Sequence, residues 1–394
     1  MKTQAVSATG LMRYSNGHEE DTVLARALEY GAIGNDDLNR HNLGRLMYDR
    51  IFQFSQSRPS RVVIRRGLEA QLDEWLGHRA EDGLFLVFDP AVAEIADRLQ
   101  AMLPIRAAMA FEGGEASKRL ATVAALADQL LEAGATRHSM VLGLGGGVTT
   151  DVAAFLASVY MRGIACALLP TSLLAMVDAA LGGKNGVDLG AHKNILGTIR
   201  QPDLVLCDPN WLESLPDQEF RTGLAEVVKV AAILDEDWFV WLEEHAELIL
   251  SRDAVICEKM ITVSAGLKMG VVIEDESEAW RRMLLNFGHT VGHAYEGLSE
   301  FLIPHGQAVA MGMVIECRAA HSEAGPRIES LLRRLGLPTA PPAEFSFAAT
   351  DLWKLMQNDK KSRSGEVRIA VPTKMGGARI QALSEEAFLG ALER

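Results

Sequence analysis

Three histidines and one glutamate carry the clearest chemical signal in the sequence. His289 and His293 lie four residues apart in "NFGHTVGHAYE", and His305 completes three histidines within seventeen residues. Four residues are about one helical turn, so a helix would place the imidazoles of His289 and His293 on one face. A catalytic zinc takes three nitrogen or oxygen ligands and keeps one position open. Glu226 and the three histidines are therefore candidate ligands, and spacing alone does not decide which histidines bind metal.

Two glycine-rich stretches are typical of phosphate binding. In "LGLGGGVTTDVAAFLAS", Gly146 and Gly147 follow an expected strand and open an expected helix, whose N-terminal N–H groups suit a pyrophosphate. Val148 stands where the dinucleotide fingerprint needs glycine, so a simple tight turn is the alternative. In "GGKNGVDLGAHKNILG", Lys184 and Lys193 stand among glycines in an expected loop. Such lysines commonly meet phosphate, and a solvated loop is the alternative.

The stretch "GLAEVVK" holds a third possible constellation. A helix would place Glu226 and Lys229, three residues apart, on one face. A surface ion pair is the plain interpretation of this spacing. The residues around Glu226 are apolar, however, which argues against its full exposure.

The elements that must position these residues fall into two kinds. The runs "RVVIRRG", "GLFLVFD" and "SMVLGLGGG" predict strands, and "EASKRLATVAALADQLLEAGA" predicts a helix before the last of them. Strands that alternate with helices indicate a parallel α/β sheet. From about Leu215 the apolar residues recur at helical spacing. We therefore expect an N-terminal extension over 1–58, an α/β domain over 59–215 and a mostly α-helical domain over 216–394.

Composition excludes several classes of function. The chain has 394 residues, 48% of them hydrophobic, and a net charge of -13, which argues against a general nucleic-acid surface. The four cysteines form no CxxC pair, so neither a zinc ribbon nor a disulfide framework is indicated. No apolar run reaches the roughly 18 residues that a membrane span needs, and the N-terminus is too polar for a signal peptide. We expect a cytoplasmic protein that binds neither nucleic acid nor membrane.

Seven motifs, in order, resemble those of the sugar phosphate cyclase family, and within it those of 3-dehydroquinate synthase most. They are "GGGVTTDVAAFLASVYMRG", "LLPTSLLAMVDAALGGKNGVD", "KNILGTIRQP", "LPDQEFRTGLAEVVK", "LLNFGHTVGHAYE", "HGQAVAMGM" and "NDKK". The similarity runs from about Arg61 to the C-terminus. It implies a Rossmann-like NAD-binding α/β domain, a helical metal- and substrate-binding domain, and a site in the cleft between them.

The resemblance also implies roles for individual residues. Zinc, or cobalt, would be held by Glu226, His289 and His305, while His293 would face the substrate phosphate. NAD would lie against Asp89, Glu115, Lys118, Gly146, Gly147, Val148, Asp151, Thr171, Ser172 and Lys193. The substrate would meet Asp178, Lys184, Lys193, Asn194, Lys229, Lys268, Arg282, Asn286, His293 and Lys360, with Arg162 supplied by the second subunit of a homodimer.

The implied enzyme is an NAD- and metal-dependent carbon–oxygen lyase. It would convert 3-deoxy-D-arabino-heptulosonate 7-phosphate into 3-dehydroquinate and phosphate. The steps would be transient oxidation by NAD, elimination of phosphate, return of the hydride and an intramolecular aldol closure. Arg282, with Lys268, would hold the substrate carboxylate, because a guanidinium fork fits a carboxylate well.

Some positions depart from the usual 3-dehydroquinate synthase pattern. "KNGVD" stands where "KTGVN" is usual, and Ala91 stands where an asparagine usually meets NAD. Sedoheptulose 7-phosphate, the substrate of 2-epi-5-epi-valiolone synthases, and an amino analogue of the heptulosonate are therefore alternative substrates. A metal-dependent polyol dehydrogenase and a non-catalytic NAD-binding protein are remoter alternatives. The lysines expected at phosphate argue against the first, and the complete set of metal ligands argues against the second.

Overall fold

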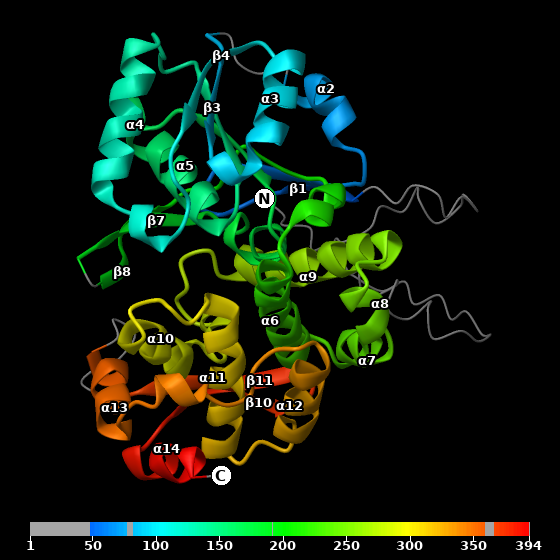
Figure 1. Ribbon diagram of the computed structural model, residues 1–394, viewed down its shortest axis with the longest axis vertical. Coiled ribbons are helices and arrows are strands. Elements are labelled where there is room, and N and C mark those ends of the chain that lie inside the picture. The colour runs from blue at the N-terminus through cyan, green and yellow to red at the C-terminus, as the bar shows by residue number, and fades with distance from the viewer. Residues whose placement is uncertain (1–47, 77–81, 191, 359–365, 394) are drawn as a thin grey trace, which may run out of the picture.

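The computed structural model describes residues 48–76, 82–190, 192–358 and 366–393. Figure 1 shows two halves stacked along the long axis. One is a sheet flanked by helices, and the other is mostly helical and contains the C-terminus. This arrangement confirms the predicted fold class, a Rossmann-like α/β part followed by a mostly α-helical part. The predicted extension over 1–58 lies mostly outside the described residues. The proposed boundary near 215 falls between the last strand of the sheet and the first helix of the second half.

Within the described residues, seven strands form the large sheet, in the order β1-β2-β9-β6-β5-β3-β4. Their bounds are Tyr48–Phe52 (β1), Ser60–Ile64 (β2), Leu84–Phe88 (β3), Ile105–Ala110 (β4), Met140–Gly145 (β5), Ala165–Pro170 (β6) and Leu204–Cys207 (β9). β1 pairs antiparallel with β2, and the other neighbouring pairs are parallel. β1 lies within the segment 1–58, so this part of the segment forms an edge strand of the sheet.

Helices cover the sheet, which explains why its central strands are apolar throughout. The described α-helices of this half are Leu72–Leu76 (α2), Ala93–Met102 (α3), Leu120–Glu132 (α4) and Gly147–Val159 (α5). α3 packs on β3, and α5 packs on β5 and β6. β5 is buried at every position and β3 at all but its last, as expected for parallel strands covered on both faces.

The strand order reverses between β3 and β5. After β3 the chain moves outward to β4, and it then returns to the other side of β3 as β5. In open α/β sheets, dinucleotides bind beside the carboxyl ends of the strands at such a reversal. Asp89 follows β3 and Gly146 follows β5, so both predicted NAD contacts lie at this point.

The lysine-rich stretch expected to be a loop is a β-hairpin. Its strands are Lys184–Leu189 (β7) and His192–Ile199 (β8), and they pair antiparallel. β7 packs against α5, with Val187 fully buried. The prediction of a loop was wrong because the many glycines lower local strand propensity, whereas pairing and packing supply the stabilisation. The hairpin presents Lys184 and Lys193 from a defined ladder.

Nine α-helices and one hairpin form most of the described part of the second half. The helices are Asp217–Leu234 (α6), Glu236–Glu244 (α7), Ala246–Leu250 (α8), Ala254–Glu274 (α9), His289–Leu298 (α10), His305–Ala319 (α11), Gly325–Arg334 (α12), Ala349–Asn358 (α13) and Glu385–Leu392 (α14). The hairpin joins Arg368–Lys374 (β10) to Gly377–Ala382 (β11). The helical spacing noted from about Leu215 agrees with these helices, whereas the hairpin was not predicted.

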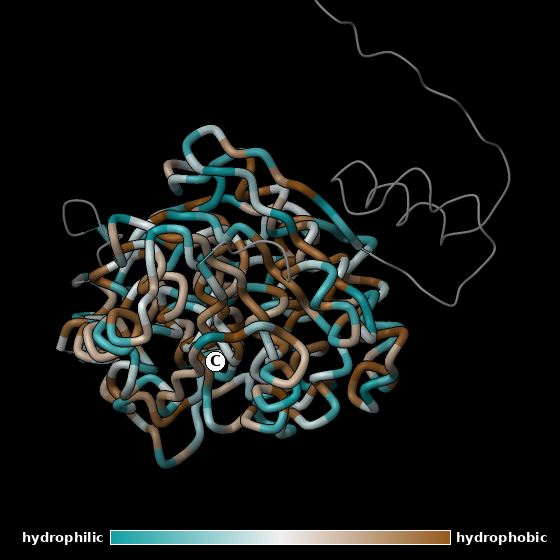
Figure 2. The backbone as a smooth tube through the Cα atoms, turned by 90° about the horizontal axis from the view of Figure 1, so that it is seen from above, coloured by the Kyte–Doolittle hydropathy of each residue, from teal (hydrophilic) through white to brown (hydrophobic). Residues whose placement is uncertain are grey.

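The core of this half lies around α6 and α11. Both are buried over most of their length, as is typical of helices that are apolar on all sides. A second, smaller cluster of buried side chains joins α10 and α11 to α13, α14 and β10. Figure 2 shows apolar segments running through the interior and hydrophilic turns at the periphery. Among the described helices, none is both long and apolar enough to cross a membrane.

Candidate active site

Three helices bring the predicted metal ligands together. Glu226 lies in α6, His289 begins α10 and His305 begins α11. One ligand atom from each of the three lies within 4.8 Å of the others. Glu226 Oε1 is 3.4 Å from His289 Nε2 and 3.2 Å from His305 Nε2. Glu226 and His289 are buried and His305 is partly exposed, so the cluster has one side open to a ligand.

Close backbone contacts hold these helices in place. A Cβ added at Gly306 of α11 would lie 2.0 Å from the carbonyl oxygen of Thr222 in α6. A Cβ at Gly312 of α11 would lie 2.0 Å from the carbonyl oxygen of Gly288, the residue before α10. A side chain at either position would push the helices apart, because real Cβ atoms do not approach so closely. The two glycines therefore set the separation of the three ligands.

Hydrogen bonds and charge prepare His289 and Glu226 to hold a cation. His289 Nδ1 lies 3.1 Å from the carbonyl oxygen of Phe287, so Nδ1–H donates there and Nε2 keeps its lone pair towards Glu226. Burial and the nearby Lys229 lower the pKa of His289, which favours the neutral ligand form. Burial alone would raise the pKa of Glu226, but Lys229 and His289 hold it well below its ordinary value. One carboxylate and two imidazoles are a donor set that fits zinc.

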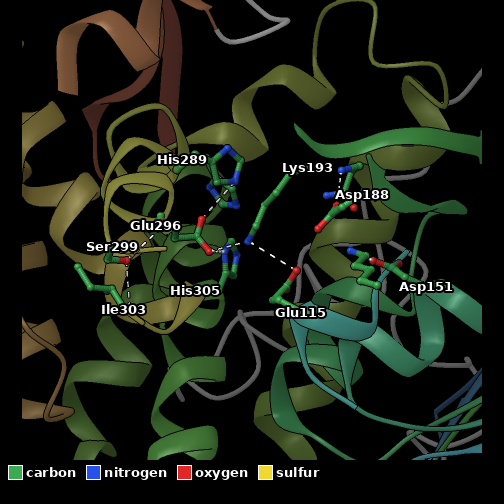
Figure 3. A network of polar contacts seen from close by, with 12 residues as sticks. Glu115, Asp151, Asp188, Lys193, His289, Glu296, Ser299, Ile303 and His305 are labelled. Atoms are coloured by element: carbon green, nitrogen blue, oxygen red, sulfur yellow. Dashed lines mark hydrogen bonds and ion pairs between the residues drawn. The ribbon is translucent and has the colours of Figure 1, made fainter. Parts of the chain in front are cut away.

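Glu296 is a site residue that the sequence analysis did not single out. It lies in α10, three residues after His293, and only 2% of its side chain is exposed. Its Oε1 is 3.3 Å from His305 Nδ1 and 3.0 Å from Lys193 Nζ, and its Oε2 is 3.8 Å from His293 Nε2 (Figure 3). Burial lowers the pKa of His305, but Glu296 and Glu226 outweigh it and raise that pKa to about 10. The i, i+3 spacing from His293 was the available signal.

Asp178, Lys229 and Lys268 form a network beside Glu226, in which the two lysines are buried and Asp178 is partly exposed. Lys268 Nζ lies 2.6 Å from Asp178 Oδ1, and Lys229 Nζ lies 3.9 Å from the same oxygen. Lys229 also forms an ion pair with Glu226. Burial opposes the charge of Asp178, but Lys268 and Lys229 hold its pKa below the ordinary value. The structure thus places these three predicted substrate contacts next to the metal ligands.

Arg282 is neither a surface residue nor part of an α-helix that includes Asn286. It begins the 3₁₀ helix Arg282–Asn286 and is 2% exposed. Its Nη1 donates to the carbonyl oxygen of Glu276 and its Nη2 to that of Gly182, both at 2.8 Å. These bonds use two of the five N–H groups of a guanidinium. Arg282 therefore supports the backbone of this region, and any substrate carboxylate would need the remaining donors.

Glu278 joins two further predicted substrate contacts. Its carboxylate lies 2.5 Å from Lys184 Nζ and accepts a hydrogen bond of 3.0 Å from Asn286 Nδ2. Lys184 belongs to β7, whereas Asn286 and Glu278 belong to the helical half. Glu278 was not among the predicted site residues, and no local pattern around it marks such a role.

The predicted NAD contacts gather at the carboxyl edge of the sheet. Gly146 is the N-cap of α5, with Gly147 and Val148 in its first turn, and Thr171 and Ser172 follow β6. Asp89 follows β3, and its carboxylate lies where a Cβ on Gly113 would be. That close approach brings the loop that carries Glu115 to the same edge. Lys118 Nζ is 2.5 Å from Asp151 Oδ2, so these two residues form a buried ion pair there.

The remaining predicted residues are placed differently. The backbone N–H of Asn194 donates to Asp188 Oδ1 at 2.6 Å, which fixes the hairpin next to Lys193. Arg162 ends the 3₁₀ turn Tyr160–Arg162, is exposed, and has a left-handed φ of 65°. Lys360 lies outside the described residues.

Comparisons with known proteins agree with this architecture. A 3-dehydroquinate synthase of Saccharolobus solfataricus is 38% identical over 325 residues, which cover 80% of this chain and 90% of that protein. A 2-epi-5-epi-valiolone synthase from Streptomyces hygroscopicus, solved with NAD⁺ and Zn²⁺ bound, superposes with a TM-score of 0.78. It is 28% identical, and the match covers 87% of this chain and 98% of that one.

A 2-deoxy-scyllo-inosose synthase complexed with carbaglucose-6-phosphate, NAD⁺ and Co²⁺ shares the fold, with a TM-score of 0.79 and 23% identity. The match covers 88% of this chain and 99% of that one. The family described as 3-dehydroquinate synthase N-terminal matches residues 108–222, and that described as 3-dehydroquinate synthase C-terminal matches residues 223–362. The resemblance drawn from the motifs is confirmed, and the chain belongs to the 3-dehydroquinate synthase family of enzymes.

Proposed function

We propose that the protein converts 3-deoxy-D-arabino-heptulosonate 7-phosphate into 3-dehydroquinate and phosphate, with NAD and zinc as cofactors. The observation that carries this proposal is that a possible metal site and a group of lysines lie next to each other. The three-donor cluster of Glu226, His289 and His305 lies beside lysines that can hold an anion. Family membership, together with relatives that bear the name 3-dehydroquinate synthase, supports the same reaction.

The two cofactors would occupy neighbouring parts of the site. Zinc, for which cobalt could substitute, would be held by Glu226, His289 and His305. NAD would lie at the reversal of the sheet, against Asp89, Gly146 and the other residues predicted at that edge. When bound, NAD supplies a reversible hydride acceptor and the metal lowers the pKa of the substrate hydroxyl that is oxidised. The solved 2-epi-5-epi-valiolone synthase, which holds NAD⁺ and Zn²⁺, supports this pair.

The chain's own residues would bind and orient the sugar phosphate. Lys184, Lys193, Asn194 and His293 would hold the phosphate, because ammonium and imidazole groups favour an oxyanion. Asp178 and Lys229, which lie beside Glu226, would orient the substrate hydroxyls next to the metal. Arg282 and Lys268 would hold the carboxylate. Most of the rate enhancement would come from this positioning and from fixed charges.

A homodimer would complete the site. Arg162 is exposed on a turn of the sheet half, which suits a side chain that reaches into the site of a second copy. Met161, next to it, is 47% exposed, and Val159 is 45% exposed. Apolar side chains next to an exposed arginine are typical of a protein interface.

A second candidate substrate is sedoheptulose 7-phosphate. The fold shared with a 2-epi-5-epi-valiolone synthase at 28% identity favours it, as do the unusual letters of "KNGVD". That sugar phosphate carries no carboxylate, so it makes no demand on Arg282. The structure in which Arg282 donates to two backbone carbonyls is compatible with either substrate.

One experiment separates the candidates. The protein, loaded with Zn²⁺ and NAD⁺, is incubated separately with the heptulosonate phosphate, its amino analogue and sedoheptulose 7-phosphate, and phosphate release is measured. We expect fastest release from the heptulosonate phosphate, with 3-dehydroquinate as the organic product. Preferential turnover of either other sugar would overturn the proposed substrate and leave the cyclase reaction in place.

A further inference from the structure

The carboxylate of Glu296 connects the metal cluster to the hairpin of the other half. Its Oε1 lies between His305 Nδ1, at 3.3 Å, and Lys193 Nζ, at 3.0 Å. His305 belongs to α11, whereas Lys193 reaches across from β8, as Figure 3 shows. A single buried oxygen atom is thus shared by a candidate metal ligand and a candidate phosphate ligand.

The backbone around Glu296 fixes the position of this carboxylate. The carbonyl oxygen of Glu296 accepts a hydrogen bond of 3.0 Å from Ser299 Oγ and one of 2.9 Å from the N–H of Phe301. Ser299 Oγ in turn accepts a hydrogen bond from the N–H of Ile303 at 3.2 Å. The end of α10 is therefore tied to the segment that leads into α11. Glu296 cannot follow Lys193 without disturbing this segment.

The contact with His305 selects the ring nitrogen that faces the metal cluster. With Nδ1–H donating to Glu296 Oε1, Nε2 is the ring nitrogen left for a metal, and it faces Glu226 Oε1 at 3.2 Å. A carboxylate on the far nitrogen orients a ligating imidazole and increases its basicity. Glu296 therefore stands in the relation to His305 that the carbonyl of Phe287 has to His289.

Lys193 competes with His305 for the same oxygen. Its ammonium group lies 3.0 Å from Glu296 Oε1, 3.8 Å from Glu115 Oε2 and 4.5 Å from the ring centre of Phe301. An anion that binds Lys193 must therefore share the ammonium group with a carboxylate that already holds it, or draw it away. Any such exchange leaves Glu296 more fully available to His305.

We propose that Glu296 is a positioning residue with opposite effects on the two ligands: it strengthens metal binding through His305 and weakens phosphate binding by holding Lys193. The inference deepens the proposed function and rests on its zinc site. It concerns how the site is tuned, because Glu296 would act through His305 and Lys193, the residues expected at the metal and at the phosphate.

The test compares Glu296→Gln with Glu300→Gln. Glu300 is exposed and lies four residues further along the chain, so both variants remove one negative charge from the same region. Zinc affinity is measured by competition with a chromophoric chelator. The affinity of the zinc-free protein for inorganic phosphate is measured by calorimetry, and thermal unfolding is recorded for both variants.

We expect the two affinities of Glu296→Gln to move in opposite directions. Zinc should bind about 10- to 100-fold more weakly, the usual cost of losing such a partner. Inorganic phosphate should bind about fivefold more tightly, because Lys193 no longer has to leave a carboxylate. Glu300→Gln should change neither affinity. A role confined to structure would weaken both together and lower the unfolding temperature.

Each other outcome has a definite meaning. Wild-type zinc and phosphate affinities in Glu296→Gln, or a parallel loss of both, would overturn the proposal. Two zinc ions per wild-type chain, the second lost in Glu296→Gln, would also overturn it, because Glu296 would then be a ligand with His293 and His305. A wild-type chain that binds no zinc would instead overturn the proposed function.

A second variant covers a failure of Glu296→Gln to fold. Glu296→Asp keeps the charge but shortens the side chain by one methylene, which draws the carboxylate away from both His305 and Lys193. The same opposite changes, smaller in size, are then expected. Unchanged affinities in Glu296→Asp would contradict the proposal.

Discussion

Glu226, His289 and His305 project from three helices whose backbones touch, whereas Lys184 and Lys193 project from a hairpin whose second strand is mostly exposed. The metal cluster derives its geometry from packing: glycines at two helix contacts set the spacing of the ligands. The positions of the two lysines depend on acidic residues of the helical half, because Lys184 pairs with Glu278 and Lys193 with Glu296. One region is preorganised, and the other must exchange partners to bind an anion.

The largest contrast is expected between two histidines on one turn of α10. His289→Ala should remove bound zinc and reduce turnover about 10³-fold or more, because a metal ion contributes several kcal/mol of charge stabilisation. His293→Ala should keep the metal, since His293 lies outside the cluster of Glu226, His289 and His305. Elemental analysis of both variants is the measurement. Equal loss of zinc from the two variants would contradict the assignment of His289 as a metal ligand and His293 as a substrate contact.

On the hairpin side, Lys193→Met should leave the zinc content unchanged while lowering kcat/KM about 10²-fold. A charge-assisted bond to an anion contributes about 1.5–3 kcal/mol, which sets this magnitude. Lys354→Met, at a solvated ion pair, is the matched control and should behave as wild type. Loss of zinc from Lys193→Met would contradict the separation between a metal site on the helices and an anion site on the hairpin.

Arg282 tests whether one residue can both stabilise the fold and bind substrate. Arg282→Ala should lower the free energy of unfolding by about 3 kcal/mol, because it leaves two buried carbonyl oxygens without their donors. From the sequence, Arg282 was expected only at the substrate carboxylate, so this structural role is an addition. Arg281→Ala is the control: Arg281 is 35% exposed and pairs with Glu274, so its loss should cost about 0.5 kcal/mol. Denaturant unfolding of both variants is the measurement, and equal stabilities would contradict the structural role.

The smallest effect is expected at Asp188, which accepts the N–H of Asn194 in the hairpin. Asp188→Ala should raise KM about fivefold through looser placement of Lys193, since one such hydrogen bond contributes about 1 kcal/mol. Asp188→Asn keeps an acceptor oxygen and should remain close to wild type. Zinc content should be normal in both. An equally large kinetic defect in Asp188→Asn and Asp188→Ala would show that the negative charge of Asp188 matters, and would contradict the role of its hydrogen bond in placing Lys193.

The metal cluster could be predicted from the sequence better than the lysine-bearing hairpin. The helical spacing of His289 and the apolar stretch around Glu226 are local patterns, so the helices and the burial of Glu226 follow from them. The β7–β8 hairpin, the edge strand β1 and the β10–β11 hairpin depend on pairing between segments, which local propensity does not encode.

Long-range contacts also explain the site residues that were missed. Glu296 was quoted within the histidine motif, but its partners His305 and Lys193 come from other elements. Arg282 was predicted as a site residue, but its contacts with the backbone were not, because only the fold decides that Arg282 is buried and its neighbour Arg281 partly exposed. Glu278 acquires its role solely because β7 and the helical half meet.

The number of turnovers per NAD⁺ tests the proposed cyclase reaction most directly. Zinc-loaded protein is mixed with excess 3-deoxy-D-arabino-heptulosonate 7-phosphate and a known, sub-stoichiometric amount of NAD⁺, while phosphate release and absorbance of NADH are followed together. Because the hydride is taken and returned within one turnover, we expect phosphate to exceed NAD⁺ many times over without accumulation of NADH. Product equal only to the NAD⁺ supplied, with NADH rising in step, would contradict the cyclase and indicate a dehydrogenase.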